Sequence, residues 1–314
     1  MKRRDFINKT FQAGFLTASA VPFINLPGTF SRPESYPNKS EKFLKDKYDL
    51  VAVKGGEAAV MFDKGIESLG GMKTFVKKNQ TVVLKPNIGW DVVPEKGANT
   101  NPLLVNRIIR HCFDAGAKDV YVFDHTCDIQ NRCYANSGIE KAAKDAGAKI
   151  VTGANESYYH EVEIKGAKAL KKAKIHELII ESDVFINIPV LKNHGSSSLT
   201  ISMKNLMGIV WDRWFWHQND LHQCIADCAL YRKPDLNIID AYLVMMKNGP
   251  RGISTEDVLE MKSQIITTDI LAGDAAAAKL FGIEPDEISY IKIADEMKIG
   301  TKDLSKLSIN RIKM

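Results

Sequence analysis

Short apolar runs alternate with amphipathic stretches along most of the chain, starting near residue 49. Apolar runs bounded by turn residues predict buried strands, here at residues 50–53, 81–85, 119–124, 149–152, 184–189, 236–240 and 264–268. Helical spacing predicts helices at residues 66–76, 103–115, 139–146, around 203 and at 271–281. This alternation favours an α/β fold, a mainly parallel sheet with helices on both faces. The charged segment around residues 162–165 predicts an excursion such as a hairpin.

Polar residues directly follow five of the predicted strands. They are Lys85 with Asn87, Asp124 with His125, Lys192 with His194, Asp240, and Asp269. In an open α/β sheet, ligands bind outside the carboxyl ends of the strands. We therefore expect these side chains to converge on one cleft. Polar residues at such positions are also typical of solvated turns, so both interpretations stay open.

Lys204 and Asn205 lie inside an otherwise apolar stretch, where a buried lysine is costly unless it is satisfied. Together with Lys85 and Lys192, Lys204 predicts binding of an anionic group such as a carboxylate or phosphate. A desolvated lysine among other cations is also able to act as a base or nucleophile. The alternative is a set of structural ion pairs with nearby carboxylates, namely Asp124, Asp240 or Asp274.

Three histidines form a candidate metal site: His194, His217 and His222. Neutral imidazoles suit zinc, iron or nickel, so a transition metal is the candidate cofactor. His217 and His222 are five residues apart, so one regular helix does not place both on the same face, and His217 has to precede the helix. Three tryptophans within residues 211–216 favour a pocket lid or a partner surface over a core strand.

The five cysteines lack the close spacing of ferredoxin-type ligands, so the sequence does not predict an iron–sulfur cluster. The sequence leaves open whether Cys127 pairs with Cys133, or Cys224 with Cys228. The formal net charge of +5 includes four basic residues and one acidic residue among the first 20, which leaves +2 for the rest. So small a balance gives no reason to expect a nucleic-acid partner.

The first 20 residues have the layout of a secretory signal. Arg3 and Arg4 precede a short apolar region that ends in Ala18, Ser19 and Ala20, and the paired arginines resemble the twin-arginine type. The alternative is an uncleaved amphipathic helix. Residues 21–45 are rich in Pro, Ser, Asn and Lys, as expected of a linker. We therefore predict an exported, periplasmic protein carried by the twin-arginine translocase, with one α/β domain at residues 46–314.

Several stretches, taken together and in order, resemble the domain-of-unknown-function family DUF362: residues 83–87, 100–102, 187–194, 199–208, 233–240, 248–250 and 273–274. The resemblance implies one shared α/β domain with a site at these motifs, but it carries no settled activity. It adds Asn101, Asn248 and Asp274 to the predicted ligand-binding residues, which are otherwise Lys85, Asn87, Asp124 and Asn205. Some members carry ferredoxin-type segments whose cysteines this sequence lacks.

The leading hypothesis is an exported enzyme that uses a cofactor or metal in redox or acid–base chemistry on a small anionic substrate. Its predicted catalytic residues are Lys192, His194, Lys204 and Asp240, with Asp240 or Asp274 orienting a lysine or acting as a base. The alternative is a periplasmic protein that binds or carries a metal or an anion without turnover. A third hypothesis is a partner subunit of a redox complex that docks through residues 211–216.

Overall fold

A ten-stranded sheet forms the centre of residues 48–314, the part of the chain that the computed structural model describes. These residues fall within one compact unit. The predicted signal peptide (residues 1–20) and linker (residues 21–45) lie outside the described residues, as does the very start of the predicted domain. No helix among residues 48–314 combines the length and the apolar character that crossing a membrane requires.

The strands of this sheet are β1 (Leu50–Lys54), β2 (Thr81–Pro86), β3 (Asp119–Val122), β4 (Lys149–Ile150), β7 (Val184–Ile188), β8 (Val190–His194), β9 (Ser198–Thr200), β10 (Leu236–Met245), β11 (Val258–Thr267) and β12 (Ile309–Lys313). Their spatial order is β12-β1-β11-β10-β7-β2-β3-β4, and β8 joins β10 to β9. The run from β10 through β7, β2 and β3 to β4 is parallel, and β11 is antiparallel to both of its neighbours. The predicted α/β fold with a mainly parallel sheet is therefore confirmed.

The helices are α2 (Ala58–Ser68), α3 (Pro102–Asp114), α4 (Gln130–Asn136), α5 (Ile139–Asp145), α6 (Glu177–Glu181), α7 (Ser202–Asn205), α8 (Trp214–Gln218), α9 (Leu221–Tyr231), α10 (Ile270–Phe281) and α11 (Ser289–Glu296). Asn101 caps α3, since its side chain accepts the backbone N–H groups of Leu103 and Leu104. Asp269 caps α10 in the same way.

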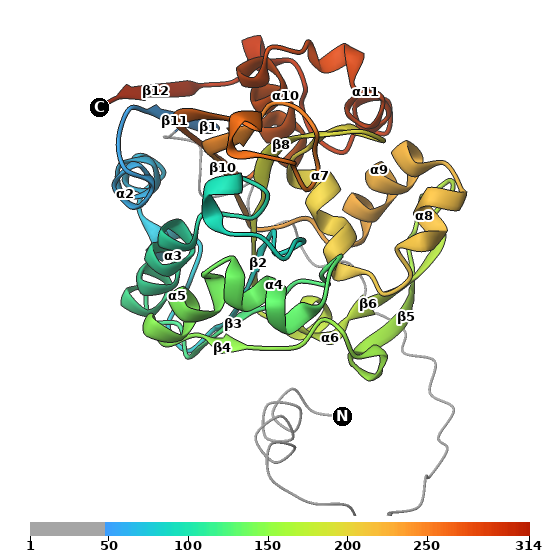
Figure 1. Ribbon diagram of the computed structural model, residues 1–314, viewed down its shortest axis with the longest axis horizontal. Coiled ribbons are helices and arrows are strands. Elements are labelled where there is room, and N and C mark those ends of the chain that lie inside the picture. Colours follow the sequence, from blue (N-terminus) through green and yellow to red (C-terminus); the bar gives the residue numbers. More distant parts are fainter. Residues whose placement is uncertain (1–47) are drawn as a thin grey trace, which may run out of the picture. The chain divides into compact units, whose positions relative to one another are not determined.

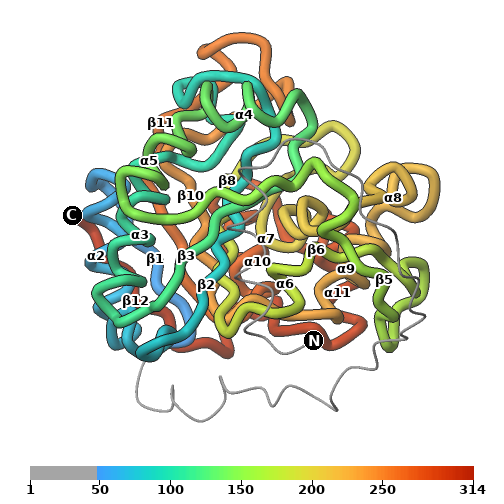
Figure 2. The backbone as a smooth tube through the Cα atoms, turned by 90° about the horizontal axis from the view of Figure 1, so that it is seen from below, coloured from blue at the N-terminus to red at the C-terminus, as the bar shows by residue number. Residues whose placement is uncertain are grey.

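The helices cover both faces of the sheet. Alternate residues of a strand point to opposite faces, so apolar side chains on each face pack against helices. On β11, the Ile266 side chain reaches Gly65 of α2, whereas that of Thr267 reaches Gly273 of α10. Figures 1 and 2 show α2 and α3 on one side of the strands and α7 and α10 on the other. One buried cluster, to which α2, α3 and α5 contribute their apolar faces, fills the first interface.

The strand predicted at residues 264–268 begins earlier, at Val258, and two further sequence-based boundaries were also wrong. The helix predicted at residues 66–76 is instead α2, which ends at Ser68 ahead of Gly70 and Gly71, both at positive φ. Glycine in this left-handed conformation typically ends a helix. The strand predicted at residues 236–240 continues to Met245, so Asp240 lies inside β10 rather than at its end.

The predicted excursion forms a separate two-stranded antiparallel sheet, β5 (Tyr159–Glu163) and β6 (Lys172–His176). An isolated bridge between Ile175 and Val210 ties it to the segment that precedes α8. Buried Asp227 of α9 holds the turn between β5 and β6, because its carboxylate accepts the backbone N–H groups of Lys168, Ala169 and Leu170. The small sheet is thereby fixed as the wall of a cleft described below.

Candidate functional site

A small cavity of about 60 Å³ lies where β2 and β3 end, beside β8 and α7. We call it the inner cavity. Eight residues predicted from the sequence line it: Lys85, Asn87, Asp124, His125, Lys192, His194, Lys204 and Asn205. Its volume is room for roughly two water molecules, or for one carboxylate-sized group. The folded chain therefore brings these side chains together from four separate elements.

Lys85 and Asp124 form a buried ion pair in the wall of the inner cavity. The Lys85 Nζ atom lies 2.8 Å from the Asp124 carboxylate, and both side chains are almost fully buried. Burial lowers the pKa of Lys85, and the nearby Asp124 carboxylate opposes that shift. The other Asp124 oxygen accepts the backbone N–H of Ile88 at 2.7 Å. These contacts compensate both charges, so the pair is part of the scaffold of the site.

Asn205 connects this pair to the rest of the site. Its Oδ1 accepts from Lys85 Nζ at 2.8 Å and from the Asn87 side-chain amide at 2.9 Å. Its own amide donates to the Lys85 carbonyl and to Asn187 Oδ1. All four hydrogen-bonding positions of the Asn205 side chain are used, which explains why a polar residue is tolerated inside an apolar stretch.

Lys192 reaches the inner cavity from β8 and is almost fully buried. Its Nζ donates to the carbonyl of Ala98 and to Asn87 Oδ1 at 3.2 Å, both uncharged acceptors. Burial lowers the pKa of Lys192 to about 7, and the positive charges of Lys204 and Lys85 add to the shift. Lys192 is thus able to gain or lose a proton near neutral pH.

The amine of Lys204 has a weaker hydrogen-bond acceptor than the amine of Lys192. Its side-chain hydrogen bond runs to the thioether sulfur of Met207 at 3.3 Å, a weak acceptor. Burial lowers the pKa of Lys204 to about 8, and the charges of Arg213 and Lys85 contribute in the same direction.

Arg213 brings a further cation to the inner cavity. Its guanidinium donates to the backbone carbonyls of His125 at 2.8 Å and Thr126 at 2.6 Å, and to the Cys127 sulfur. Within residues 48–314, no ion pair joins Lys192, Lys204 or Arg213 to a carboxylate. Three cationic side chains therefore line one small cavity without a counter-ion.

His194 is held in its neutral form. Its Nδ1 accepts the backbone N–H of Ser196 at 3.2 Å, so the ring proton sits on Nε2. Burial lowers the pKa of His194 to about 3, and the charges of Lys204 and Lys192 reinforce the shift. His194 is thus a hydrogen-bond donor to a ligand and a weak base at neutral pH.

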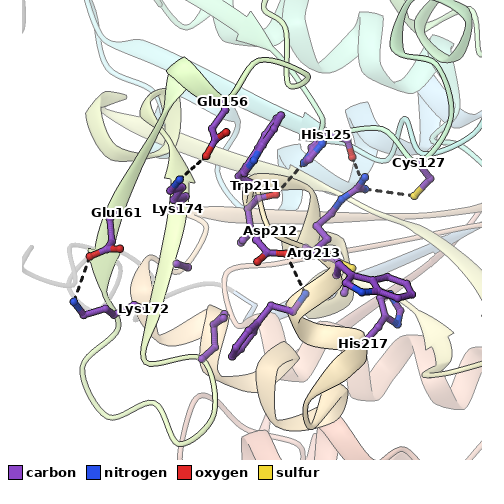
Figure 3. Close-up of a pocket in the computed structure, with 16 residues that line it drawn as sticks. His125, Cys127, Glu156, Glu161, Lys172, Lys174, Trp211, Asp212, Arg213 and His217 are labelled. Atoms are coloured by element: carbon purple, nitrogen blue, oxygen red, sulfur yellow. Dashed lines mark hydrogen bonds and ion pairs between the residues drawn. The ribbon is translucent and has the colours of Figure 1, made fainter.

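A wider cleft of about 900 Å³ adjoins the inner cavity, and Figure 3 shows its lining. We call it the outer cleft. It shares four residues with the inner cavity: His125, Cys127, Met207 and Arg213. Strands β5 and β6 form the opposite wall, where Lys172 pairs with Glu161 and Lys174 with Glu156. The lysines of that wall are therefore paired with carboxylates, whereas Asp212, which also lines the outer cleft, accepts the backbone N–H of Phe215.

The tryptophan-rich segment has three different environments. Trp211 lines the outer cleft and stacks on His125, with ring centroids 5.0 Å apart and planes 7° apart. Trp214 is 67% exposed, whereas Trp216 is fully buried. The pocket-lid prediction fits Trp211 and Trp214, and it is wrong for Trp216. The predicted docking of a redox partner on this segment stays a prediction.

A family model matches residues 82–279, which covers every element that lines the inner cavity; its description is "Domain of unknown function (DUF362)". The chain belongs to the DUF362 family.

One curated relative of this DUF362 chain is the "Thylakoid-associated protein sll1697" of Synechocystis sp., 25% identical over 243 residues, or 75% of this chain and 73% of the relative. Two solved structures are similar at low identity. The lactate racemase apoprotein from Thermoanaerobacterium thermosaccharolyticum gives a TM-score of 0.46 at 13% identity, over 73% of this chain and 56% of that one. A Thermotoga maritima protein gives 0.42 at 10% identity, over 76% and 59%. The chain thus spans a little over half of either solved structure.

Five further residues predicted from the sequence lie outside the lining of both cavities: Asn101, Asp240, Asn248, Asp269 and Asp274. Asp269 instead caps α10. Asp274 accepts the backbone N–H groups of Ser202 and Met203, and so fixes the start of α7, which carries Lys204. Asp240 accepts the backbone N–H of Asn101 at 2.7 Å. Burial raises the pKa of Asp240 to about 6 and that of Asp274 to about 7.

Asn248 contacts a carboxylate that holds the backbone, since Asp257 accepts the N–H groups of Ile253 and Ser254. Its amide donates to Asp257 at 2.7 Å, and it precedes the cis Gly249–Pro250 bond. Pro250 itself lines the inner cavity. These contacts give Asn248, like Asn101, Asp240 and Asp274, a positioning role in this structure.

The predicted three-histidine metal site is not assembled. Among residues 48–314, no group of three or more His, Cys, Asp or Glu side chains is arranged to hold a metal ion. His217 lines the outer cleft, His194 the inner cavity, and His222 stacks on Tyr290 of α11. The three residues lie on β8, α8 and α9, and the break between the two helices turns His222 toward α11. All five cysteines are free.

Several residues of the site were missed from the sequence. Arg213 was hidden in the tryptophan-rich segment, although an arginine among aromatic residues is itself a signal of a binding surface. Asn187 sits inside a strand of otherwise apolar residues, where a buried amide needs partners and so points to a polar network. Met207 carries no sequence signal of its own, since methionine is an ordinary core residue.

Gly208 provides the test of the scaffold, because a Cβ atom there would lie 1.8 Å from Asp124 Oδ1 and 2.7 Å from Lys85 Nζ. We predict that Gly208→Ala separates the buried pair and lowers the free energy of unfolding by roughly 3 kcal/mol or more. Gly195→Ala is the matched control, since the nearest atom there is 4.0 Å away. Urea unfolding of both variants checks this, and a Gly208→Ala variant as stable as Gly195→Ala would contradict it.

Proposed function

We propose that this DUF362 chain is an enzyme that binds a small anionic organic substrate in the inner cavity and transfers a proton through Lys192. The observation that carries the proposal is the convergence of Lys192, Lys204 and Arg213 on one cavity, where none of them pairs with a carboxylate of the described part of the chain. Buried charges are ordinarily paired, and leaving them unpaired costs several kcal/mol. A bound anion would remove that cost, and a structural role would have brought a carboxylate.

Proton transfer is supported by the environment of Lys192. A group is an effective acid–base catalyst when its pKa lies near the working pH, and burial brings the pKa of Lys192 to about 7. Its two hydrogen bonds run to uncharged oxygens, so neither charge state is locked. His194, neutral with its proton on Nε2, is placed to donate a hydrogen bond to the substrate.

The two cavities divide the substrate between them. The inner cavity has room for the anionic group, whereas the remainder of a larger substrate extends past Met207 into the outer cleft. The stacked pair of His125 and Trp211 offers that remainder a flat apolar surface.

The test uses sulfate as a probe, because its charge does not change across the neutral pH range. Isothermal titration calorimetry should detect sulfate binding to the full chain. Lys192→Met and Lys204→Met should each weaken it by about tenfold or more, since a hydrogen bond between charged groups contributes roughly 1.5–3 kcal/mol. Both substitutions keep the side-chain volume and remove the charge.

Lys172→Met is the matched control, because Lys172 lines the outer cleft but is paired with Glu161. Its sulfate affinity should equal that of the unmodified chain. Equal affinity in all three variants, or no binding to the unmodified chain, would contradict the proposal. An organic anion that co-purifies with the protein and is never converted would support the alternative function, a carrier without turnover.

We further propose that the chain is exported by the twin-arginine translocase. The support is the order of Arg3, Arg4, the apolar region and the Ala18–Ala20 segment. The thylakoid-associated relative is compatible with export. Replacing Arg3 and Arg4 together by lysine should move the protein from the periplasmic to the cytoplasmic fraction of its native host. An unchanged distribution would count against this route.

A further inference from the structure

Lys204 differs from the other two lysines of the inner cavity in what its amine contacts. Lys85 Nζ lies 2.8 Å from a carboxylate, and Lys192 donates to two oxygens. Among the described residues, Lys204 donates to a thioether sulfur alone, although its side chain is only 7% exposed. A buried amine with such a weak acceptor gains little from carrying a proton, and its lone pair is available for reaction.

The amine of Lys204 also has a route to a substrate. Its hydrogen-bond partner among residues 48–314, Met207, lines both the inner cavity and the outer cleft. Methionine is unbranched and changes rotamer easily, so a substrate that enters from the outer cleft is able to displace it. The amine of Lys85 has no such freedom to reach a substrate, because Asp124 and Asn205 hold it in place.

We propose that Lys204 is a nucleophile that forms an imine with the carbonyl group of a 2-oxo acid. The inference rests on the proposed function, because the substrate's carboxylate is the anion that the inner cavity binds. Arg213, which stays charged at the pH of the reaction and pairs with no carboxylate among residues 48–314, holds that carboxylate. In a 2-oxo acid the carbonyl carbon is bonded directly to the carboxylate, so a cavity of about 60 Å³ suffices for both groups.

The step balances without a further reactant. The neutral Lys204 amine adds to the carbonyl carbon, and the electron pair of the C=O double bond moves to the oxygen. The amine then loses a proton and the oxygen gains one, which gives a carbinolamine. Loss of water forms the C=N bond, so amine and ketone become imine and water. A lysine desolvated beside other cations is a recognised means of keeping such an amine neutral.

The experiment traps the imine by reduction. The full chain is incubated with pyruvate and sodium borohydride at about pH 8, where Lys204, with a pKa of about 8, is partly neutral and ordinary lysines with a pKa of roughly 10.4 are charged. We expect one reduced pyruvate adduct per chain, and peptide mass spectrometry should place it on Lys204. Lys204→Met should lose the adduct, whereas Lys172→Met should retain it. Excess sulfate should suppress it.

The outcomes separate this inference from the proposed function. An adduct on Lys204 of the unmodified chain supports the inference even if Lys204→Met fails to fold. Labelling of Lys204 no greater than that of exposed lysines, in a protein that binds sulfate, overturns the imine and leaves the anion site standing. A chain that neither binds sulfate nor forms the adduct overturns both.

Discussion

The buried ion pair between Lys85 and Asp124 is the contact on which the rest of the site depends. It joins the ends of β2 and β3, and the absence of a side chain at Gly208 makes room for it. Asn205 extends the pair to α7, so that one hydrogen-bonded network sets the positions of three elements. The two charges of the pair compensate each other, so the pair makes the cavity wall rigid. It does not compensate the charges of the neighbouring side chains.

The neighbours whose charge stays uncompensated are Lys192, Lys204 and Arg213. Besides Lys85, which is paired, three more cations line the same cavity, and none of them pairs with a carboxylate within residues 48–314. Desolvation lowers the pKa of the two lysines toward neutrality, to about 7 and about 8. For stability this is a cost, because the unfolded chain binds these protons more tightly than the folded chain does. The cost grows as pH falls from roughly 10.4, the ordinary lysine pKa, and is complete below a pH of about 7. The burial that lowers these pKa values also supplies an anion site and an amine that is partly neutral near pH 8. Functional sites often combine such a loss of stability with a gain in reactivity.

The sequence predicted the architecture and the inner cavity well, because both follow from local patterns. Buried strands were visible as apolar runs, and the carboxyl ends of parallel strands must meet at one edge of the sheet. Lys85, Asp124 and Lys192 were found in this way. Asp240 was misplaced because β10 continues for five residues beyond it, and nothing local marked that extension.

The histidine triad failed for a different reason. The directions of α8 and α9 are set by packing against distant segments, and His222 turns toward Tyr290, which lies 68 residues further along the chain. Arg213 was missed because it reaches its site through the backbone carbonyls of residues 125 and 126, more than 80 residues earlier in the chain. Such contacts depend on tertiary structure, so the aromatic residues around Arg213 indicate a binding surface but not the cavity that Arg213 lines.

The dependence of sulfate affinity on pH tests most directly whether these uncompensated cations hold an anion. Because burial lowers the pKa of Lys192 to about 7 and that of Lys204 to about 8, both amines are charged below this range and neutral above it. Arg213 stays charged throughout. Calorimetry should therefore show the highest affinity near pH 6 and a fall of about tenfold or more by pH 9. An affinity that is constant over this range, or that rises with pH, would contradict the account.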